Sequence, residues 1–427
     1  MHPQGLIGVA LFLAIALALS KHRMRINLRV VAAGVLLQFV LAFILLRYQP
    51  AVDLFTHFAA GVTKVISFAD EGIKFIFGDK LIDPSGPWGF IFAVKVLPVI
   101  IFFASLMSVL YHLRIMQVVV AGVAWVLRRT LGVTGAEAIS AAANIFLGQT
   151  EAPLLVRPYI PTMTRSQIMA VMVGGFATIA GSVLAAYIGI LGGDSHEQQI
   201  LFAKHLMTAS VMSAPAGFVM AKIMLPETES PRDESLRSLL SEPVPTRNVV
   251  DAAAAGATDG LKLALNVGAM LIAFVALLAM INWPLTALSE TSAIAAWRTD
   301  HNLPTFTLQT LLGYLFTPIA WCMGIAPPDA PHFGALLGTQ IIATEFVAYL
   351  DLGRFLHDAT ITHRSAEIAT YALCGFCNLP SIAIQIGGLS AIAPDRRSDF
   401  ATLGLRAMVA GALACWMTGA IAGVFIQ

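Results

Sequence analysis

Residues 144–153 read NIFLGQTEAP and lie deep inside an apolar region, yet they hold two amides, a hydroxyl, a carboxylate, a glycine and a proline. The mostly apolar flanks, 136–144 and 154–160, are each too short for a bilayer, which takes about 20 apolar residues. Two half-length helices that meet at a polar tip form a re-entrant hairpin. Irregular backbone at membrane depth persists only where protein buries it or where it lines a watery cavity. We therefore expect a functional site at this tip rather than a soluble loop with an ordinary exposed glutamate.

The composition supports a polytopic membrane protein. The chain has 427 residues, of which 57% are hydrophobic and 12% charged, whereas soluble domains carry about 25% charged residues. A net charge of +1 gives no reason to expect a nucleic acid or an acidic partner. The four cysteines, Cys322, Cys374, Cys377 and Cys415, fall in apolar segments and form no disulfide pattern. Cys374 and Cys377 form a C-x-x-C without a second ligand pair, which favours packing over metal or redox chemistry.

The apolar segments predict an all-α integral membrane protein with eight transmembrane helices. They cover about 6–19, 30–46, 88–110, 166–191, 201–225, 260–281, 368–392 and 403–426. No Lys or Arg precedes the first segment, so it does not resemble a signal peptide. The basic cluster from Lys21 to Arg29 follows it, which places the N-terminus outside and this loop in the cytoplasm.

Other segments are expected at the membrane surfaces. Residues 51–80 mix charges with Phe, Val and Ile, and they predict an amphipathic interfacial helix on the outer side. Residues 307–323 predict a second one. The acidic loop at 193–197 and the loop at 282–304 are expected outside, and the polar stretch 226–248, with four prolines, is a cytoplasmic linker.

Three landmarks of the first half recur in the second half in the same order. Trp125 and Trp321 are 196 residues apart, Glu151 and Glu345 are 194 apart, and the Gly-Phe pairs at 175 and 375 are 200 apart. Each repeat crosses the membrane three times, so the second copy is inverted, as in secondary transporters. A second hairpin, at 333–355, then carries Thr344 and Glu345 at its tip. The predicted units are 1–50 (two helices), 51–87 (interfacial helix), 88–225 (repeat 1), 226–259 (linker) and 260–427 (repeat 2).

The span after each hairpin is expected to be broken. Residues 174–181 contain three glycines, and residues 375–381 contain Pro380, which removes a backbone donor and frees carbonyl groups upstream. Two broken helices and two hairpin tips would converge on one cavity, with half-helix ends aimed into it.

The two hairpins offer different chemistry. Gln149, Thr150 and Glu151 can match the donor and acceptor edge of a flat polar molecule such as a nucleobase.

In the second copy, Glu345 with Asn378 and Ser381 suits the diol of a sugar, and Phe376 could pack on an apolar ring. The alternatives are that Asn378 and Ser381 only cap a kinked helix and that Phe376 is core.

A cation site is also predicted. Asn144 and Thr178 supply side-chain oxygens, and the irregular backbone supplies carbonyl oxygens, which are the ligands that a hard cation such as Na⁺ prefers. A structural hydrogen bond between these two residues is the alternative interpretation. Proton coupling through the acids is the alternative to Na⁺.

Several of these motifs resemble those of the concentrative nucleoside transporter family, from about Trp88 to the C-terminus. They are GQTEAP at 148–153, EFVAY at 345–349, YALCGF at 371–376 with Asn378 and Ser381, and SIAIQIGGL at 381–389. The resemblance implies a homotrimer in the inner membrane of a bacterium that imports nucleosides by an elevator motion of a transport domain against a scaffold.

The resemblance also implies roles for individual residues. It implies base contacts at Gly148, Gln149, Thr150, Glu151 and Val183, and ribose contacts at Glu345, Asn378 and Ser381 with Phe376 near the ring. It implies Na⁺ ligands at Asn144, Leu147, Thr178 and Ile179, where Leu147 and Ile179 use backbone oxygens. Some members have serine at the position of Thr178, and some bacterial members use protons.

Two other classes compete with a transporter. An intramembrane enzyme would use Glu151 and Glu345 as acid and base, but the chain has no H-E-x-x-H or G-x-S-x-G motif. A channel is the third class, and it would not accumulate substrate against a gradient. We expect no enzymatic cofactor.

Overall fold

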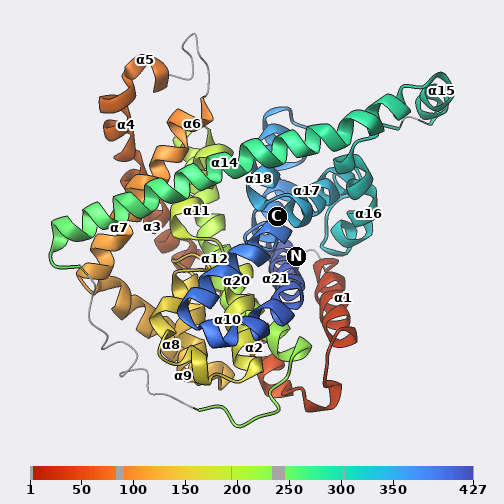
Figure 1. Ribbon diagram of the computed structural model, residues 1–427. Helices are drawn as coiled ribbons and strands as arrows, with labels where there is room; N and C mark the ends of the chain where they lie inside the picture. The colour runs from red at the N-terminus through yellow and green to blue at the C-terminus, as the bar shows by residue number, and fades with distance from the viewer. Residues whose placement is uncertain (1–2, 83–90, 194, 233–245, 302, 427) are drawn as a thin grey trace.

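The computed structural model describes residues 3–82, 91–193, 195–232, 246–301 and 303–426. Regular structure in these ranges is entirely helical, which confirms the all-α class (Figure 1). Parts of five predicted segments lie outside the described residues: the end of the interfacial segment, the start of the third span, much of the linker, and one residue of each of the two outer loops.

Within the described ranges, six helices or helix pairs are long and apolar enough to cross a membrane, and each overlaps a predicted span. They are α2 (Leu28–Leu46), α6 with α7 (Phe92–Lys95 and Leu97–His112), α10 with α11 (Arg165–Phe176 and Gly181–Gly192), α12 (His196–Met224), α14 (Val249–Ser289) and α21 (Arg397–Phe425). The remaining two predicted spans form shorter apolar helices, α1 (Gly5–Ala18) and α20 (Leu379–Ile392). A break separates α20 from α19 (His363–Ala372).

Helix α14 corrects two predicted boundaries. It begins after Asn248, whose side chain accepts a hydrogen bond from the Asp251 N–H at 2.9 Å, and it continues to Ser289. Residues 249–259 are expected in the linker and 282–289 in an outer loop because these residues are less apolar. Four consecutive alanines at 252–255 favour helix whatever the polarity of their neighbours. The rest of the outer loop also contains a helix, α15 (Ser292–Asp300).

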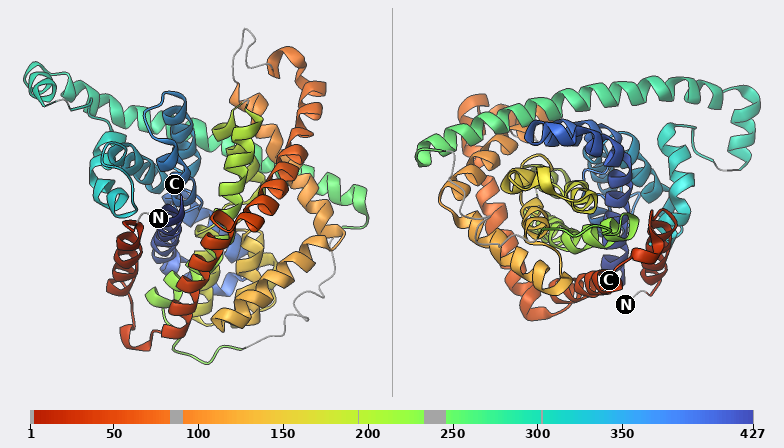
Figure 2. Two further views of the ribbon diagram at one scale, coloured as in Figure 1. Left: turned by 180° about the vertical axis from the view of Figure 1, so that it is seen from behind. Right: turned by 60° about the horizontal axis from the view of Figure 1, so that its bottom comes forward.

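The spans divide into an inner bundle and an outer frame. In α10–α11, α12 and α21, 94% of the most apolar window is buried, against 22% in α2 and α6–α7 and 11% in α14. The right view of Figure 2 shows α9 (Gly135–Asn144) to α12 in the centre with α21 beside them, and α2, α3 (Gln49–Ser67), α7, α8 (Ile115–Leu131) and α14 around them. Apolar helices that the chain does not cover need lipid or another subunit to cover them.

Small residues bring two helices of the frame together. A Cβ on Gly256 would stand 2.6 Å from Ser108 Cβ, and one on Gly260 would stand 2.8 Å from Ile101 Cα. These glycines are four residues apart and form one face of α14, a spacing that lets helices in membranes approach closely. Helix α14 is thereby fixed along α7.

The two predicted hairpins differ in their second arms. The second one pairs two full helices, α17 (Ala330–Ile342) and α18 (Glu345–His357). The first one has α9 as its first arm, but its return consists of two short 3₁₀ segments, η2 (Ala152–Val156) and η3 (Ile160–Thr162). The prediction of a second half-helix is therefore wrong. Three prolines, at 153, 158 and 161, remove backbone donors that an α-helix needs.

Helices are also present at the predicted interfacial segments: α3 with α4 (Ala69–Phe77) and α5 (Asp79–Ile82), and α16 (Leu308–Cys322). Their depth in the membrane stays a prediction.

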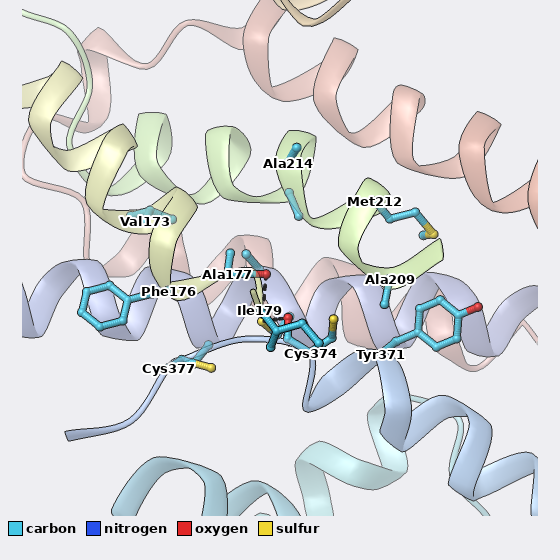
Figure 3. Packing of buried hydrophobic residues seen from close by; sticks show 14 of the residues in the cluster. Val173, Phe176, Ala177, Ile179, Ala209, Met212, Ala214, Tyr371, Cys374 and Cys377 are labelled. Atoms are coloured by element: carbon cyan, nitrogen blue, oxygen red, sulfur yellow. Dashed lines mark hydrogen bonds between the residues drawn. The ribbon is translucent and has the colours of Figure 1, made fainter. Parts of the chain in front are cut away.

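Both predicted helix breaks are present, and they face each other. Helix α10 ends at Phe176 and α11 begins at Gly181, while α19 ends at Ala372 and α20 begins at Leu379. The Phe376 N–H donates to the Thr178 carbonyl at 3.3 Å. Figure 3 shows how the two irregular segments pack among buried residues, with Cys374 and Cys377 as buried free thiols. This bond pairs a backbone donor of one break with a backbone acceptor of the other.

Candidate substrate and cation site

The tip of the first hairpin is held by the helices behind it. Residues 145–151 follow the last turn of α9 without regular structure. The Ile145 carbonyl accepts from Ser210 Oγ of α12 at 2.8 Å, and the Phe146 carbonyl accepts from the Gly181 N–H at 2.9 Å. These bonds satisfy backbone oxygens that the end of α9 leaves free, and they fix the tip against the start of α11.

The three polar side chains of this tip lie in different surroundings. Gln149 is buried, and its Oε1 has no hydrogen-bond partner in the described part of the chain. Thr150 is half-buried, whereas Glu151 is exposed and one of its oxygens, Oε2, accepts from the Gly148 N–H at 3.2 Å. The tip therefore presents an amide and a carboxylate with unused acceptor capacity.

The tip of the second hairpin carries a buried carboxylate. Glu345 is the first residue of α18 and is 5% exposed. Its Oε1 accepts from the Tyr187 hydroxyl at 2.9 Å, and its Oε2 accepts from Asn378 Nδ2 at 2.7 Å. The helix N-terminus also favours a negative charge there. Each oxygen keeps a lone pair for a further donor, such as a substrate hydroxyl.

Asn378 has two roles at once. Its Oδ1 caps α20 by accepting from the Ser381 N–H at 2.8 Å, while its Nδ2 donates to Glu345. The capping alternative is therefore true of Asn378 without excluding a role beside the carboxylate. Phe376 is partly exposed and packs against the hydrophobic core, while its neighbours on both sides are buried.

The contacts form a closed ring that joins the two tips. Gly181, which contacts the first tip, begins α11. The same helix carries the buried residues Val183 and Tyr187, and Tyr187 donates to Glu345. Asn378 continues the ring into α20, where a Cβ on Gly388 would stand 2.7 Å from Thr150 Cγ2. The predicted substrate residues are thus brought around one region by the two hairpins and the two broken helices.

The predicted cation ligands lie where α9 and α10 end side by side. Asn144 Nδ2 donates to the Ser140 carbonyl at 3.0 Å and leaves Oδ1 buried without a partner in the described ranges. Thr178 Oγ1 donates to the Gly174 carbonyl at 2.9 Å, so its lone pairs stay free. A Cβ on Gly174 would stand 3.1 Å from Asn144 Nδ2. Each side chain bonds within its own segment, which is not the mutual hydrogen bond considered as the alternative.

The two backbone ligands also fit. The carbonyl oxygens of Leu147 and Ile179 accept no hydrogen bond from the described part of the chain. Neutral oxygens that accept no hydrogen bond from the protein suit a hard monovalent cation.

A buried ion pair anchors the first hairpin at its other end. Lys222 of α12 lies 2.5 Å from Glu137 Oε1 and donates to Ser166 Oγ at 3.1 Å. The other oxygen of Glu137 accepts from the Thr134 N–H at 3.1 Å as part of the capping box of α9, and also from Thr134 Oγ1 at 2.8 Å. Removal of one partner of such a pair would leave a buried charge uncompensated. The pair therefore ties the base of α9 to α10 and α12.

Three residues of this region are not predicted from the sequence. Tyr187 lies one turn after Val183, a spacing that could have suggested it, but its partner Glu345 is 158 residues away. Gln340 donates to the carbonyls of Leu373 and Gly375 at 3.2 and 3.1 Å and so holds the end of α19. Gln385 lies in the SIAIQIGGL motif, which by itself assigns it no role.

The chain is similar to known proteins over almost its whole length. Three family models match the chain: "Na+ dependent nucleoside transporter N-terminus" at residues 7–80, "Nucleoside recognition" at 93–194 and "Na+ dependent nucleoside transporter C-terminus" at 205–423. An uncharacterized transporter of Haemophilus influenzae is 47% identical over 426 residues, which cover 99% of this chain and 97% of that protein.

Two further matches carry more specific names. Sodium/nucleoside cotransporter 1 of Mus musculus is 38% identical, and the match covers 98% of this chain and 63% of that protein. The solved structure of CNTnw in an inward-facing substrate-bound state is 41% identical, with a TM-score of 0.89 and coverage of 99% of this chain and 97% of that one.

The fold, the site and these matches define a membrane transporter rather than an enzyme. The chain belongs to the family of Na⁺-dependent nucleoside transporters. The predicted resemblance is thereby confirmed.

Proposed function

We propose that the protein is a Na⁺-coupled symporter that imports nucleosides across the cytoplasmic membrane by an elevator-type alternating-access mechanism. The observation that carries the proposal is the division of the site into two chemically different ends. One end is the buried Glu345 carboxylate with Asn378, and the other is the amide and carboxylate of Gln149 and Glu151. A nucleoside has the same division into a diol and a base edge.

The diol of the ribose binds Glu345, with Asn378 and Ser381 beside it, and Phe376 packs on the ring. The base binds the first hairpin and the adjoining face of α11. The residues of that second group are Gly148, Gln149, Thr150, Glu151 and Val183. The hydroxyl groups of ribose are donors, and each oxygen of Glu345 accepts from one protein side chain and can accept a further hydrogen bond.

Na⁺ binds between the first hairpin and the break of α10–α11, through Asn144, Leu147, Thr178 and Ile179. The unpaired Asn144 Oδ1 supports this assignment. The matched family description names Na⁺. A proton gradient is the alternative driving force, because the same region holds two carboxyl groups.

The inner bundle carries the substrate and moves against the outer frame. In each of its spans 94% of the most apolar window is buried, whereas the windows of the frame spans are mostly uncovered. Apart from α15, the order of elements from α7 to α12 parallels the order from α14 to α21: a frame helix, a helix of 15 or 17 residues, a hairpin, a broken helix and a 29-residue helix. This parallel supports the inverted repeat, eight crossings and two re-entrant hairpins.

The protein assembles as a homotrimer in the lipid bilayer. The uncovered apolar side chains of α14 support a subunit contact, among them Leu265, Ile272 and Trp283.

Binding of tritiated uridine to the purified protein in detergent tests the proposal. We expect saturable binding that tightens when choline is replaced by Na⁺ at constant ionic strength. Absence of binding to uridine and to adenosine in either salt would contradict a nucleoside site. Binding that is independent of Na⁺ but changes with pH would indicate coupling to protons instead of Na⁺.

Gln149→Ala tests the base end. The variant loses an amide that makes one or two hydrogen bonds to the base, each worth about 1 kcal/mol, so uridine affinity should fall about 5- to 30-fold. Ribose used as a competitor makes no base contact and should displace uridine with an unchanged inhibition constant. A loss that is equal for uridine and for ribose would remove Gln149 from base recognition.

A further inference from the structure

Gln385 of α20 is a buried amide that the proposed site does not use. It is 0% exposed, and its Nε2 donates to the Met172 carbonyl of α10 at 3.0 Å. A carbonyl can only accept, so the amide cannot turn over without placing two acceptors against each other. Its Oε1 is therefore held as an acceptor, and no donor in the described part of the chain reaches it.

Gly175 shows that Gln385 and Gln149 are neighbours. A Cβ at this position would stand 2.5 Å from Gln385 Nε2 and 2.8 Å from Gln149 Cβ. The absence of a side chain on this glycine thus leaves room for both glutamines. One turn along α20, Gly388 leaves room for Thr150 in the same way. One face of α20 therefore supports the tip of the first hairpin.

Both glutamines carry a buried oxygen that no donor reaches within the described ranges. Gln149 has no partner there that fixes its amide, and the two ends of an amide have nearly the same shape. Rotation of this amide would turn its NH₂ group toward Gln385 and its oxygen toward the base. One hydrogen bond would then satisfy Gln385 Oε1 and give Gln149 a defined face.

We propose that Gln385 is a positioning residue for base recognition, which orients the Gln149 amide so that its oxygen faces the base. The proposal rests on the nucleoside function proposed above. Gln385 does not touch the substrate. It acts only through Gln149, and this sets its role apart from general support of the fold.

A double-mutant cycle tests this role, with equilibrium binding of tritiated uridine in Na⁺ as the measurement. We expect Gln385→Leu to weaken uridine about fivefold, the effect of one hydrogen bond. In the Gln149→Ala background the same substitution should change affinity less than about twofold, because there is no amide left to orient. Additive losses in the two backgrounds would overturn the proposal, since a general packing defect acts whether or not Gln149 is present.

Two further variants keep the result interpretable. Gln385→Glu places a carboxylic acid that burial keeps protonated. It donates to Met172 and keeps an acceptor, so it should bind uridine as the wild type does. Gln38→Leu removes another fully buried glutamine, which accepts from Thr418 at 3.4 Å in a contact between α2 and α21, and it should leave affinity unchanged. Loss of binding in Gln385→Glu equal to that in Gln385→Leu would also overturn the proposal. Failure of the wild type to bind any nucleoside would instead contradict the proposed function.

Discussion

Glu345→Gln should abolish measurable uridine binding while the protein stays folded. The carboxylate accepts from Tyr187 and Asn378, and in the proposed complex it also accepts from the ribose hydroxyls. A glutamine keeps one acceptor and turns an NH₂ group toward one of these donors. Hydrogen bonds to a charged group contribute about 1.5–3 kcal/mol each, so the loss of two corresponds to at least about a hundredfold in affinity.

Calorimetry with uridine in Na⁺ measures this loss, and thermal unfolding of the same samples checks the fold. The matched control is Asp351→Asn on the same helix, because Asp351 pairs with Arg354 at 3.2 Å rather than with Asn378 or Tyr187. It should bind uridine normally. Unchanged affinity in Glu345→Gln would remove this residue from the ribose role.

Thr178→Val should uncouple uridine binding from Na⁺. Valine keeps the shape of threonine and removes the hydroxyl oxygen from the proposed cation site. A cation between Asn144 and Thr178 ties the first hairpin to the break of α10–α11, and so it preforms the wall that holds Gln149. Coupling of about 1–3 kcal/mol is typical, and it is reciprocal, so removal of Na⁺ should weaken uridine about 5- to 150-fold in the wild type.

The measurement is uridine affinity across a Na⁺ titration at constant pH and ionic strength. In Thr178→Val the Na⁺ dependence should shrink or move to higher concentration, while affinity without Na⁺ stays near the wild-type value. Thr370→Val is the control, because Thr370 is also fully buried and donates to the carbonyl four residues earlier, at 2.9 Å. A wild-type affinity that is flat in Na⁺ and rises as pH falls would contradict the sodium site.

The polar residues at membrane depth make most of the candidate site predictable from the sequence. Glycine, proline and amide side chains within an apolar span indicate that the backbone is irregular there. The breaks near Thr178 and Phe376 and the polar tip at Glu345 therefore follow from the residue pattern alone. The predicted return arm of the first hairpin is wrong although its three prolines are visible in the sequence.

Local sequence patterns do not predict contacts between segments that are far apart in the chain. Glu345 and Tyr187 are 158 residues apart, and Gln385 and Met172 are 213 apart. Nothing near either residue in the sequence specifies its partner. The division into an inner bundle and an outer frame is equally hidden, because α14 and α21 are both apolar but differ in burial from 11% to 94%.

Uptake of tritiated uridine into proteoliposomes tests the central claim most directly. With Na⁺ outside and K⁺ inside, we predict that uridine accumulates above its external concentration and is recovered chemically intact. Ionophores that collapse the Na⁺ gradient should abolish the accumulation, whereas those that collapse only a proton gradient should not. Uptake that merely equilibrates across the membrane in every gradient would contradict a Na⁺-coupled nucleoside symporter.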